Sequence, residues 1–158
     1  MTCSNCGNKM TSIRENYKYA ACGLDYVTLA NLEVRRCKEC GEVEAVIPKI
    51  QELHRVLAQT IAKRPSMLRG REIRFLRKYL GMSGDDAAQA LGVGPSWLSR
   101  CENDKQELSA GYQRFLRLMV LYDQPNHRYS LKDLLAEKND KKPAPIKLDL
   151  GDSWQAIA

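Results

Sequence analysis

The spacing of apolar residues predicts a strand-rich first part of the chain and a helical second part. Residues 11–20 and 26–36 are rich in Tyr, Val, Thr and Leu, which favour strands, and Gly23 between them favours a turn. Residues 43–47 predict a further strand, and Pro48 interrupts the pattern after it. We therefore expect residues 1–47 to form a small β-rich domain.

A helical pattern follows over residues 49–64. Apolar residues recur there three or four positions apart and so share one helix face: Ile50, Leu53, Leu57 and Ile61. Pro65 predicts the end of this helix. We expect residues 48–69 to be a connector helix and linker that docks on one of the two domains or on a partner subunit.

Several short helices are predicted between residues 70 and 137, at about 70–80, 83–91 and 95–103, then from Ser109 and at 130–135. Ser83 is a good N-cap with acidic residues in the turn that follows, and Pro95 suits a first helical position. The apolar residues of the helix after Ser109 include Phe115, Leu116, Met119 and Val120. This part is expected to be an all-α domain.

Residues 138–158 are expected to be a tail. Its first part is rich in Lys, Asp and Pro, which is typical of a linker. Its second part, residues 146–154, alternates apolar and charged residues and suits either an edge strand or docking elsewhere. The predicted fold class is therefore α+β, a β-rich domain followed by an all-α domain.

The chain is basic, and the positive charge is concentrated. Its 158 residues carry a formal net charge of +6, which favours a polyanionic partner. Residues 63–78 hold seven cations and one acid, Glu72, and this segment is either a solvated helix face or a phosphate-facing surface. The cations are Lys63, Arg64, Arg69, Arg71, Arg74, Arg77 and Lys78.

No apolar run approaches the roughly 18 residues that a membrane span requires, and the first residues do not resemble a signal peptide. We therefore expect a cytoplasmic protein without a membrane partner. In a reducing compartment, the six cysteines favour metal binding or buried thiols over disulfides.

Four cysteines have the spacing of a structural zinc site. Two Cys-x-x-Cys pairs, each followed by a glycine, can present four thiolates to one tetrahedral Zn²⁺ ion: Cys3, Cys6, Cys37 and Cys40. Four thiolates leave no open position for a water molecule, so the ion is structural and not catalytic. The alternatives are iron in the same site, buried cysteines or a redox pair. Cys22 is expected to be a packing residue or a fifth nearby thiol, and Cys101 a buried one.

Two short helices joined by a turn predict a helix-turn-helix. Small residues at Ala87 and Ala88 allow the helices to cross closely, and Leu91 faces Val93 and Leu98 across the turn. The segment resembles the lambda-repressor-like (XRE) family over residues 70–121, chiefly at Leu91-Gly-Val and Leu98-Ser-Arg-Cys-Glu102.

This resemblance implies that the third helix enters the DNA major groove. The family's base-contacting positions fall on Pro95, Ser96 and Arg100, and Ser96 and Arg100 share one helix face because they are four residues apart. Arg100 can bind guanine through O6 and N7, whereas its alternative is a solvent-exposed or intrahelical charge. Trp97 is expected to pack on the sugar-phosphate wall, on a thymine methyl or on the connector helix.

The resemblance assigns further roles. It pairs Arg77 with Glu102 as a partly buried ion pair. At Gly84, where the family often has a Gln that contacts DNA, only the backbone N–H remains to contact a phosphate. Asp104 departs from the family's usual Gly, so Asn103 is expected to take the left-handed conformation. The complete predicted DNA-binding set is Ser83, Gly84, Pro95, Ser96, Trp97, Ser99, Arg100, Asn103 and Lys105.

The combination of the four cysteines with Arg71-Glu-Ile-Arg-Phe-Leu-Arg-Lys and Ser96-Trp-Leu-Ser-Arg100 resembles the MqsA (YgiT-type) antitoxins. The resemblance implies a zinc domain that binds a partner toxin and a C-terminal half that dimerises and represses its own promoter. We expect a homodimer built from residues 115–122 and 131–135 on a double-stranded operator. The alternatives are a stand-alone zinc-finger/helix-turn-helix regulator and a zinc-dependent protein-interaction adaptor.

An enzyme is the least favoured class. The only histidines are His54 and His127, and neither has a nucleophile or a pair of carboxylates recognisably beside it in the sequence. We therefore expect a binding protein.

Overall fold

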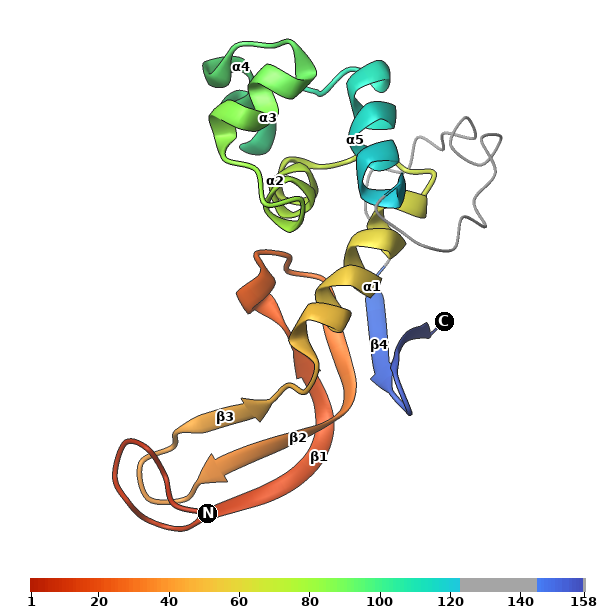
Figure 1. Ribbon diagram of the computed structural model, residues 1–158. Helices are drawn as coiled ribbons and strands as arrows, with labels where there is room; N and C mark the ends of the chain where they lie inside the picture. The colour runs from red at the N-terminus through yellow and green to blue at the C-terminus, as the bar shows by residue number, and fades with distance from the viewer. Residues whose placement is uncertain (123–144, 158) are drawn as a thin grey trace. The chain divides into compact units, whose positions relative to one another are not determined.

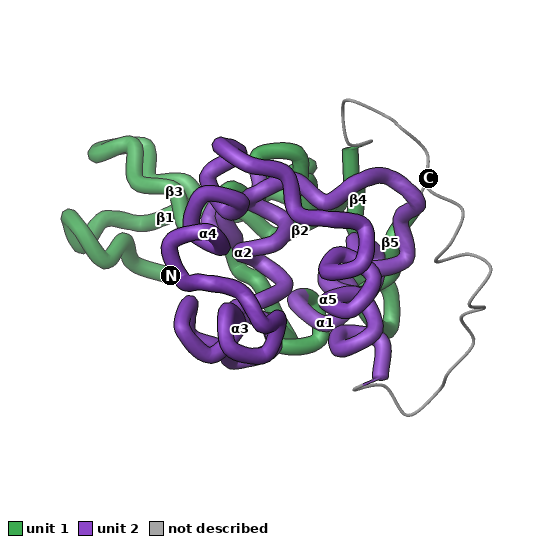
Figure 2. Tube along the Cα trace, turned by 90° about the horizontal axis from the view of Figure 1, so that it is seen from above, with its two compact units in different colours: residues 1–20, 25–53, 144–158 green, residues 21–24, 54–143 purple. Residues whose placement is uncertain are grey.

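The computed structural model describes residues 1–122 and 145–157, which divide into two compact units (Figure 2). The first unit contains residues 1–20 and 25–53 together with the C-terminal strands. The second contains residues 21–24 and the helical residues from His54 onward. Each unit is described by itself below.

A β-sheet forms the first unit, and β2 (Val27–Cys37) is its central strand (Figure 1). β1 (Met10–Lys18) pairs with it antiparallel along one edge. The other edge is shared by β3 (Val43–Val46), which is antiparallel, and β4 (Ile146–Leu150), which is parallel. A short 3-10 helix, η1 (Ala20–Cys22), follows β1 in the chain. The strands expected in the first 47 residues are therefore present.

A bulge in β2 separates its two partners on the shared edge. Between the pairs Glu15–Leu32 and Tyr17–Leu29, β2 contains one more residue than β1, and Asn31 adopts a left-handed φ of 53°. Such an insertion shifts the side-chain alternation by one position. As a result, Leu29 and Ala30 are both buried although they are adjacent. β4 pairs before the bulge and β3 pairs after it.

The end of the chain belongs to this sheet. β4 pairs with Val27–Ala30 of β2, and β5 (Trp154–Ile157) pairs antiparallel with β4. Trp154 is 2% exposed, and its indole N–H donates to the Pro48 carbonyl at 2.9 Å. The sequence pattern offered an edge strand or docking elsewhere for these residues within an outlying tail. The structure has the edge-strand alternative, with β5 at the edge of the sheet, and it makes these residues part of the sheet unit and not a separate tail.

The remaining described elements are helices. They are α1 (Ile50–Lys63), α2 (Gly70–Tyr79), α3 (Gly84–Leu91), α4 (Pro95–Glu102) and α5 (Ala110–Tyr122). Their bounds agree with the predicted spans to within a residue or two. The helix predicted at residues 130–135 lies outside the described residues. Within the parts of the chain that are described, no helix is long and apolar enough to cross a membrane.

The linker between α1 and α2 is held on α5 by buried polar side chains. Gln113 accepts from the Leu68 N–H and donates to the Leu108 carbonyl, both at 2.8 Å. Arg117, which is also buried, donates to the carbonyls of Arg64 and Ser66. Buried polar groups that are satisfied in this way favour one arrangement of the backbone. The predicted linker is therefore a docked part of the helical unit.

The second half of α1 belongs to the helical unit, which is one of the docking alternatives that its sequence left open. From His54 onward its residues are grouped with α2–α5, and Leu57 and Ile61 are fully buried. The His54 ring meets Phe75 of α2 edge-on, with 6.0 Å between ring centroids.

We predict that Trp154→Ala destabilises the sheet unit. The substitution removes a buried indole and its hydrogen bond to Pro48, and large-to-small changes of this kind cost about 3–5 kcal/mol. Hydrogen-exchange mass spectrometry of the metal-loaded protein should show faster exchange in residues 27–30 of β2. Gln155→Ala, at an exposed neighbouring position, is the control. Equal protection in both variants would contradict the prediction.

Candidate metal centre and nucleic-acid interface

Two turns of the same construction carry the four cysteines. In the first, the Gly7 N–H donates to the Cys3 carbonyl at 3.0 Å, and in the second the Gly41 N–H donates to the Cys37 carbonyl at 3.1 Å. Both glycines have left-handed φ values, 72° and 74°, which a residue with a side chain adopts only at a cost. The glycine after each Cys-x-x-Cys therefore closes the turn, as the sequence pattern predicted.

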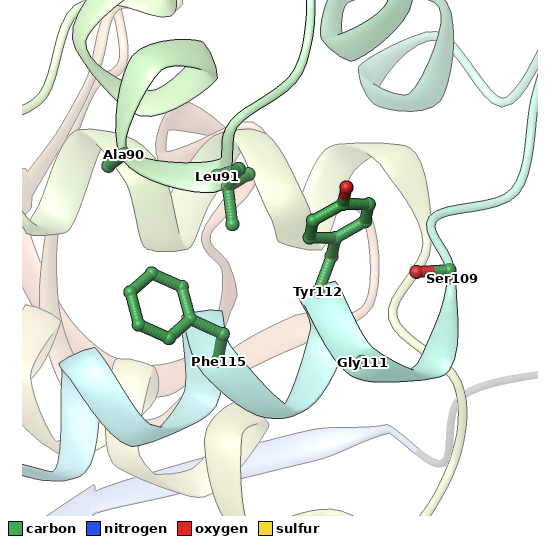
Figure 3. Close-up of a pocket in the computed structure, with 6 residues that line it drawn as sticks. All are labelled: Ala90, Leu91, Ser109, Gly111, Tyr112 and Phe115. Atoms are coloured by element: carbon green, nitrogen blue, oxygen red, sulfur yellow. The ribbon is translucent and has the colours of Figure 1, made fainter.

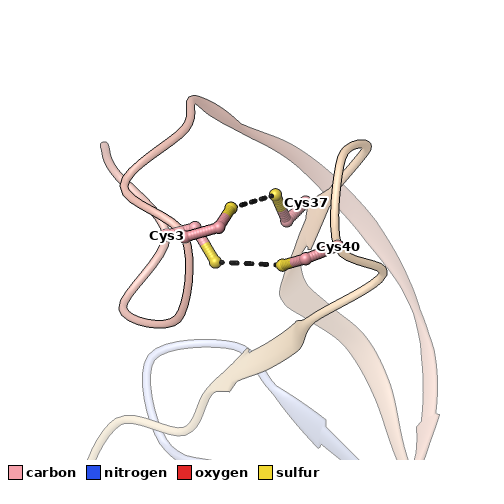
Figure 4. A group of neighbouring side chains, drawn as sticks. Cys3, Cys37 and Cys40 are labelled. Atoms are coloured by element: carbon pink, nitrogen blue, oxygen red, sulfur yellow. Dashed lines mark hydrogen bonds between the residues drawn. The ribbon is translucent and has the colours of Figure 1, made fainter.

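The turns bring the four sulfur atoms together (Figure 4). All lie within 4.8 Å of one another, with 3.6 Å between Cys3 and Cys40 and 3.4 Å between Cys6 and Cys37. A tetrahedral ion with sulfur bonds of about 2.3 Å separates its ligand atoms by about 3.8 Å. The observed separations are close to that value, and thiolates suit zinc or iron. The four cysteines can therefore hold a metal ion.

Backbone N–H groups stabilise negative charge on the two exposed cysteines of the cluster, Cys6 and Cys40. The Asn8 N–H lowers the pKa of Cys6 to about 7, with further help from the sulfurs of Cys37 and Cys40. The Glu42 N–H also lowers the pKa of Cys40, but neighbouring sulfurs and desolvation outweigh it and raise the value to about 12. These opposite shifts are expected of crowded thiols, which resist ionising together unless a cation joins them.

The two remaining cysteines lie outside the cluster. Cys22 is half-buried, and desolvation raises the pKa of its thiol. Its sulfur lies 4.0 Å from the Leu24 carbonyl oxygen, and it is not one of the four clustered thiols. Cys101 is fully buried in α4, and desolvation raises its pKa too. The expectation that Cys101 is a buried residue is confirmed.

Caps and a tight turn define the helix-turn-helix. Ser83 and Asp86 cap the start of α3 reciprocally: the Ser83 hydroxyl oxygen accepts from the Asp86 N–H, and the Asp86 carboxylate accepts from the Ser83 N–H. α3 ends at Leu91, after which the Val93 N–H donates to the Ala88 carbonyl at 2.9 Å. Pro95 begins α4, as predicted. The helices pack through Ala87, Ala88, Leu91 and Leu98, all of which are buried.

One carboxylate fastens α4 to α2. Glu102, 7% exposed, accepts from Arg77 Nε at 2.5 Å and from Arg77 Nη2 at 3.0 Å, and it also accepts from Arg74 Nε at 3.1 Å. Desolvation alone would raise the pKa of Glu102, but the hydrogen bonds from both arginines outweigh it and lower the pKa. The ion pair between Arg77 and Glu102 that the family resemblance implied is confirmed.

The basic segment at residues 63–78 is not a single phosphate-facing surface. Arg74 and Arg77 bind Glu102, and Arg64 pairs with the buried Glu72 at 3.4 Å. These three guanidinium groups are paired with buried carboxylates, which counting the charges along the sequence did not reveal. The exposed cations of the segment are Lys63, Arg69, Arg71 and Lys78.

Nearly all of the predicted DNA-binding residues are exposed; only Trp97 is half-buried. The beginnings of α3 and α4 line one hollow of about 520 Å³, which brings Gly84, Pro95, Ser96 and Ser99 together. Asp85 lines it too, a residue that the sequence indicated only as an acid of the first helical turn and not as part of the interface. Its carboxylate can accept a hydrogen bond from a base amino group.

The loop after α4 corrects one expectation. Asp104 adopts the left-handed φ of 55°, whereas Asn103 has a φ of −105°. The expectation that Asn103 takes the left-handed role was therefore wrong. Asp104 is held there because its carboxylate accepts from the Gly70 N–H, at 2.7 Å. A carboxylate at the start of α2 also interacts favourably with the helix dipole.

Asn103 and Trp97 both have protein contacts. The Asn103 amide donates to the Ser99 carbonyl at 2.7 Å and accepts from Arg74 at 3.2 Å. The Trp97 ring packs edge-on against Tyr112 of α5, with 5.7 Å between ring centroids. The sequence did not predict this contact, because periodicity relates residues within one helix, whereas Trp97 and Tyr112 lie on different helices.

Comparison with known proteins identifies the helical part. Residues 70–128 match the model of a family described as a helix-turn-helix domain. No curated protein and no solved structure matches the chain. The match begins at α2 and does not reach the four cysteines. The protein therefore carries a helix-turn-helix domain, the kind of domain that DNA-binding regulators use.

We predict that Cys37→Ser, or complete chelation of the metal, unfolds the sheet unit and leaves the helical unit folded. A small domain buries too little surface to fold readily without its metal, whereas α2–α5 have a core of their own. Two-dimensional NMR should show loss of the sheet resonances alone. Cys22→Ala is the control and should keep the metal and the spectrum. An unchanged sheet after full metal removal would refute this prediction.

We predict that Glu102→Gln destabilises the helical unit by about 2–4 kcal/mol, because it leaves two arginines without their anion. The folded protein has a lowered pKa at Glu102, so the contribution of this carboxylate to stability is complete above about pH 4.5, the ordinary pKa of a glutamate. That contribution is lost as the pH falls through the pKa of the folded state. Urea unfolding between pH 3 and 7 measures both effects. The exposed Glu107→Gln should change neither, and a Glu102→Gln protein of wild-type stability would exclude the anchoring role.

Proposed function

We propose that the protein is a sequence-specific, double-stranded DNA-binding transcriptional repressor and not an enzyme. The observation that supports this most directly is the matched helix-turn-helix, in which α4 is fastened at Glu102 while its other face remains exposed. A recognition helix needs both properties, because base edges are read by side chains whose helix is held rigidly.

Two residues of α4 are proposed to read bases. Ser96 and Arg100 are exposed and four residues apart, so both side chains project from one face of the helix. The Arg100 guanidinium can donate to guanine O6 and N7, and the Ser96 hydroxyl can donate or accept. Pro95 and Ser99 flank them and offer apolar and hydroxyl contacts.

Phosphate contacts are proposed at both ends of this surface. The Gly84 N–H at the start of α3 and the exposed Lys105 after α4 suit phosphate oxygens. Ser83 and Asn103 already serve as helix caps, so they are proposed to contribute mainly through their backbone. Each contact releases counterions, so affinity should fall steeply with salt.

The metal is proposed to be one structural Zn²⁺ ion held by Cys3, Cys6, Cys37 and Cys40. The sulfur separations and the backbone hydrogen bonds to the exposed Cys6 and Cys40 support this assignment. Zinc bound by four thiolates supplies folding stability and no reactive water molecule. Because such an ion supplies stability and no catalysis, we propose that the sheet unit binds a partner protein.

A homodimer is proposed to place two copies of α4 on an operator. Two large apolar residues on α5 are 44% exposed, Phe115 and Leu118, and Tyr122 is 82% exposed one turn further along. Phe115 and Tyr112 also line an open hollow beside Ala90 and Leu91 (Figure 3). Such a stripe suits a symmetric interface. Residues 131–135, expected to contribute as well, lie outside the described residues.

The finer role is proposed to be that of an autoregulating antitoxin of MqsA type. It rests on the sequence resemblance, which includes the now clustered cysteines. A small basic toxin encoded in a neighbouring reading frame, and bound by the sheet unit, would distinguish this role from that of a stand-alone regulator. An adaptor without DNA binding is distinguished from both by the experiment below.

We predict that Arg100→Ala weakens binding to the preferred duplex by about 5- to 150-fold, the effect of losing one bidentate base contact. Binding to a scrambled duplex should change little. Gel shifts on the DNA upstream of the gene and on its scrambled version measure this difference. Arg69→Ala, an exposed cation outside α4, is the control. Equal losses on the two duplexes would remove Arg100 from base readout, and no binding to either would favour the adaptor.

We predict that Leu118→Asp separates the dimer into folded monomers and weakens operator binding. Analytical ultracentrifugation measures the mass, and circular dichroism checks the fold. Gln89→Asp, exposed on α3, is the control. A Leu118→Asp protein that remains dimeric would place the interface elsewhere.

A further inference from the structure

The guanidinium of Arg100 has a neighbour outside its own helix. Arg100 Nε donates to Gln106 Oε1 at 3.4 Å, and both side chains are exposed. Gln106 follows α4 by four positions and lies in the loop that leads to α5. Their contact therefore arises from the course of that loop and not from helical spacing.

Backbone and side-chain hydrogen bonds fix this course. The Lys105 N–H donates to the Arg100 carbonyl at 2.9 Å and turns the loop back along α4. Asp104, in its left-handed conformation, accepts from the Gly70 N–H at 2.7 Å and ties the loop to the start of α2. Gln106 itself lines a hollow beside Gly70, Ile73 and Asp104. The two residues that precede Gln106 are therefore both held in place.

The contact engages one specific part of the guanidinium. Arginine has five N–H donors, and the Nε–H is the one nearest the backbone. When Gln106 accepts from it, the two terminal nitrogens remain available as a pair, which is the arrangement that spans O6 and N7 of guanine. A long flexible side chain that is ordered before binding loses less entropy on binding.

We propose that Gln106 is a positioning residue that holds the Arg100 guanidinium for guanine recognition and thereby sets sequence specificity without touching DNA. This inference rests on the proposed function, since it assigns a supporting role to a residue beside the proposed base-reading arginine. Gln106→Met removes the acceptor while preserving side-chain length. Gln106→Glu preserves an acceptor oxygen, and Glu107→Gln changes an exposed neighbour as a control.

The first experiment measures specificity. The wild-type protein selects a duplex from a random-sequence library, and each variant is then titrated with that duplex and with a scrambled one. Loss of one hydrogen bond should lower the ratio of the two affinities by about 2- to 10-fold in Gln106→Met. Gln106→Glu should keep the ratio even if both affinities fall, and Glu107→Gln should keep it too. The slope of affinity against salt should be the same for wild type and Gln106→Met, because no phosphate contact is removed.

A double-mutant cycle separates positioning from direct contact. In an Arg100→Ala background, Gln106→Met should leave the ratio unchanged. A further loss there would show that Gln106 contacts DNA itself, and it would overturn the proposal. So would an unchanged ratio in Gln106→Met alone while Arg100→Ala still loses specificity.

An experiment without DNA tests the contact directly. In the free protein, NMR should show slower solvent exchange of the Arg100 Nε–H in wild type and Gln106→Glu than in Gln106→Met. Equal exchange in all three would overturn the proposal. Failure of the proposed function has a different signature: either the wild type selects no sequence, or Arg100→Ala retains the full ratio, and in both cases the role of Gln106 falls with it.

Discussion

The helical unit depends on the carboxylate of Glu102. It is almost buried at the end of α4 and receives hydrogen bonds from two arginines of α2. The two helices meet so closely there that a Cβ atom on Gly70 would lie 2.6 Å from the carbonyl oxygens of Cys101 and Glu102. Ion pairing, close approach and the Asp104 bond to Gly70 all act at this point. The helix α4 is consequently anchored at its C-terminal end, where its backbone meets α2.

This anchoring also changes the interpretation of the protein's charge. A net charge of +6 and a dense basic segment favour an anionic partner, yet three of the arginines in that segment balance buried acids. The positive charge available for DNA is therefore smaller than the count implies. In the proposed function, specificity therefore rests more on the exposed face of α4, where Ser96 and Arg100 lie, than on general attraction to phosphate.

The sheet unit is stabilised differently, because it is built from segments that are far apart in the sequence. The start of β1 pairs with the end of β2 beside the cysteine turns, while β4 pairs with the other edge of β2 and Trp154 of β5 binds the Pro48 carbonyl. A cysteine cluster that can hold a metal ion and a buried tryptophan are two features that can compensate for the small size of the sheet. The helical unit is thus an insertion between two segments of one sheet.

The sequence by itself determined the features that depend on neighbours within a few residues. The Cys-x-x-Cys-Gly turns, the Ser83 cap and most of the apolar helix faces follow from local backbone preferences and helical period, and the structure contains them. Two apolar residues of the predicted helices, Ile50 and Phe115, are exposed instead, at 45% and 44%. The left-handed residue after α4 was misplaced because Asp104 is held there by Gly70, 34 positions away. Only the tertiary structure decided the parallel pairing of β4 with β2, the acidic partners of Arg64 and Arg74, and the contact between Arg100 and Gln106. Long-range pairing and side-chain geometry of this kind leave no periodic signal in a sequence, because each depends on how separate segments meet in space.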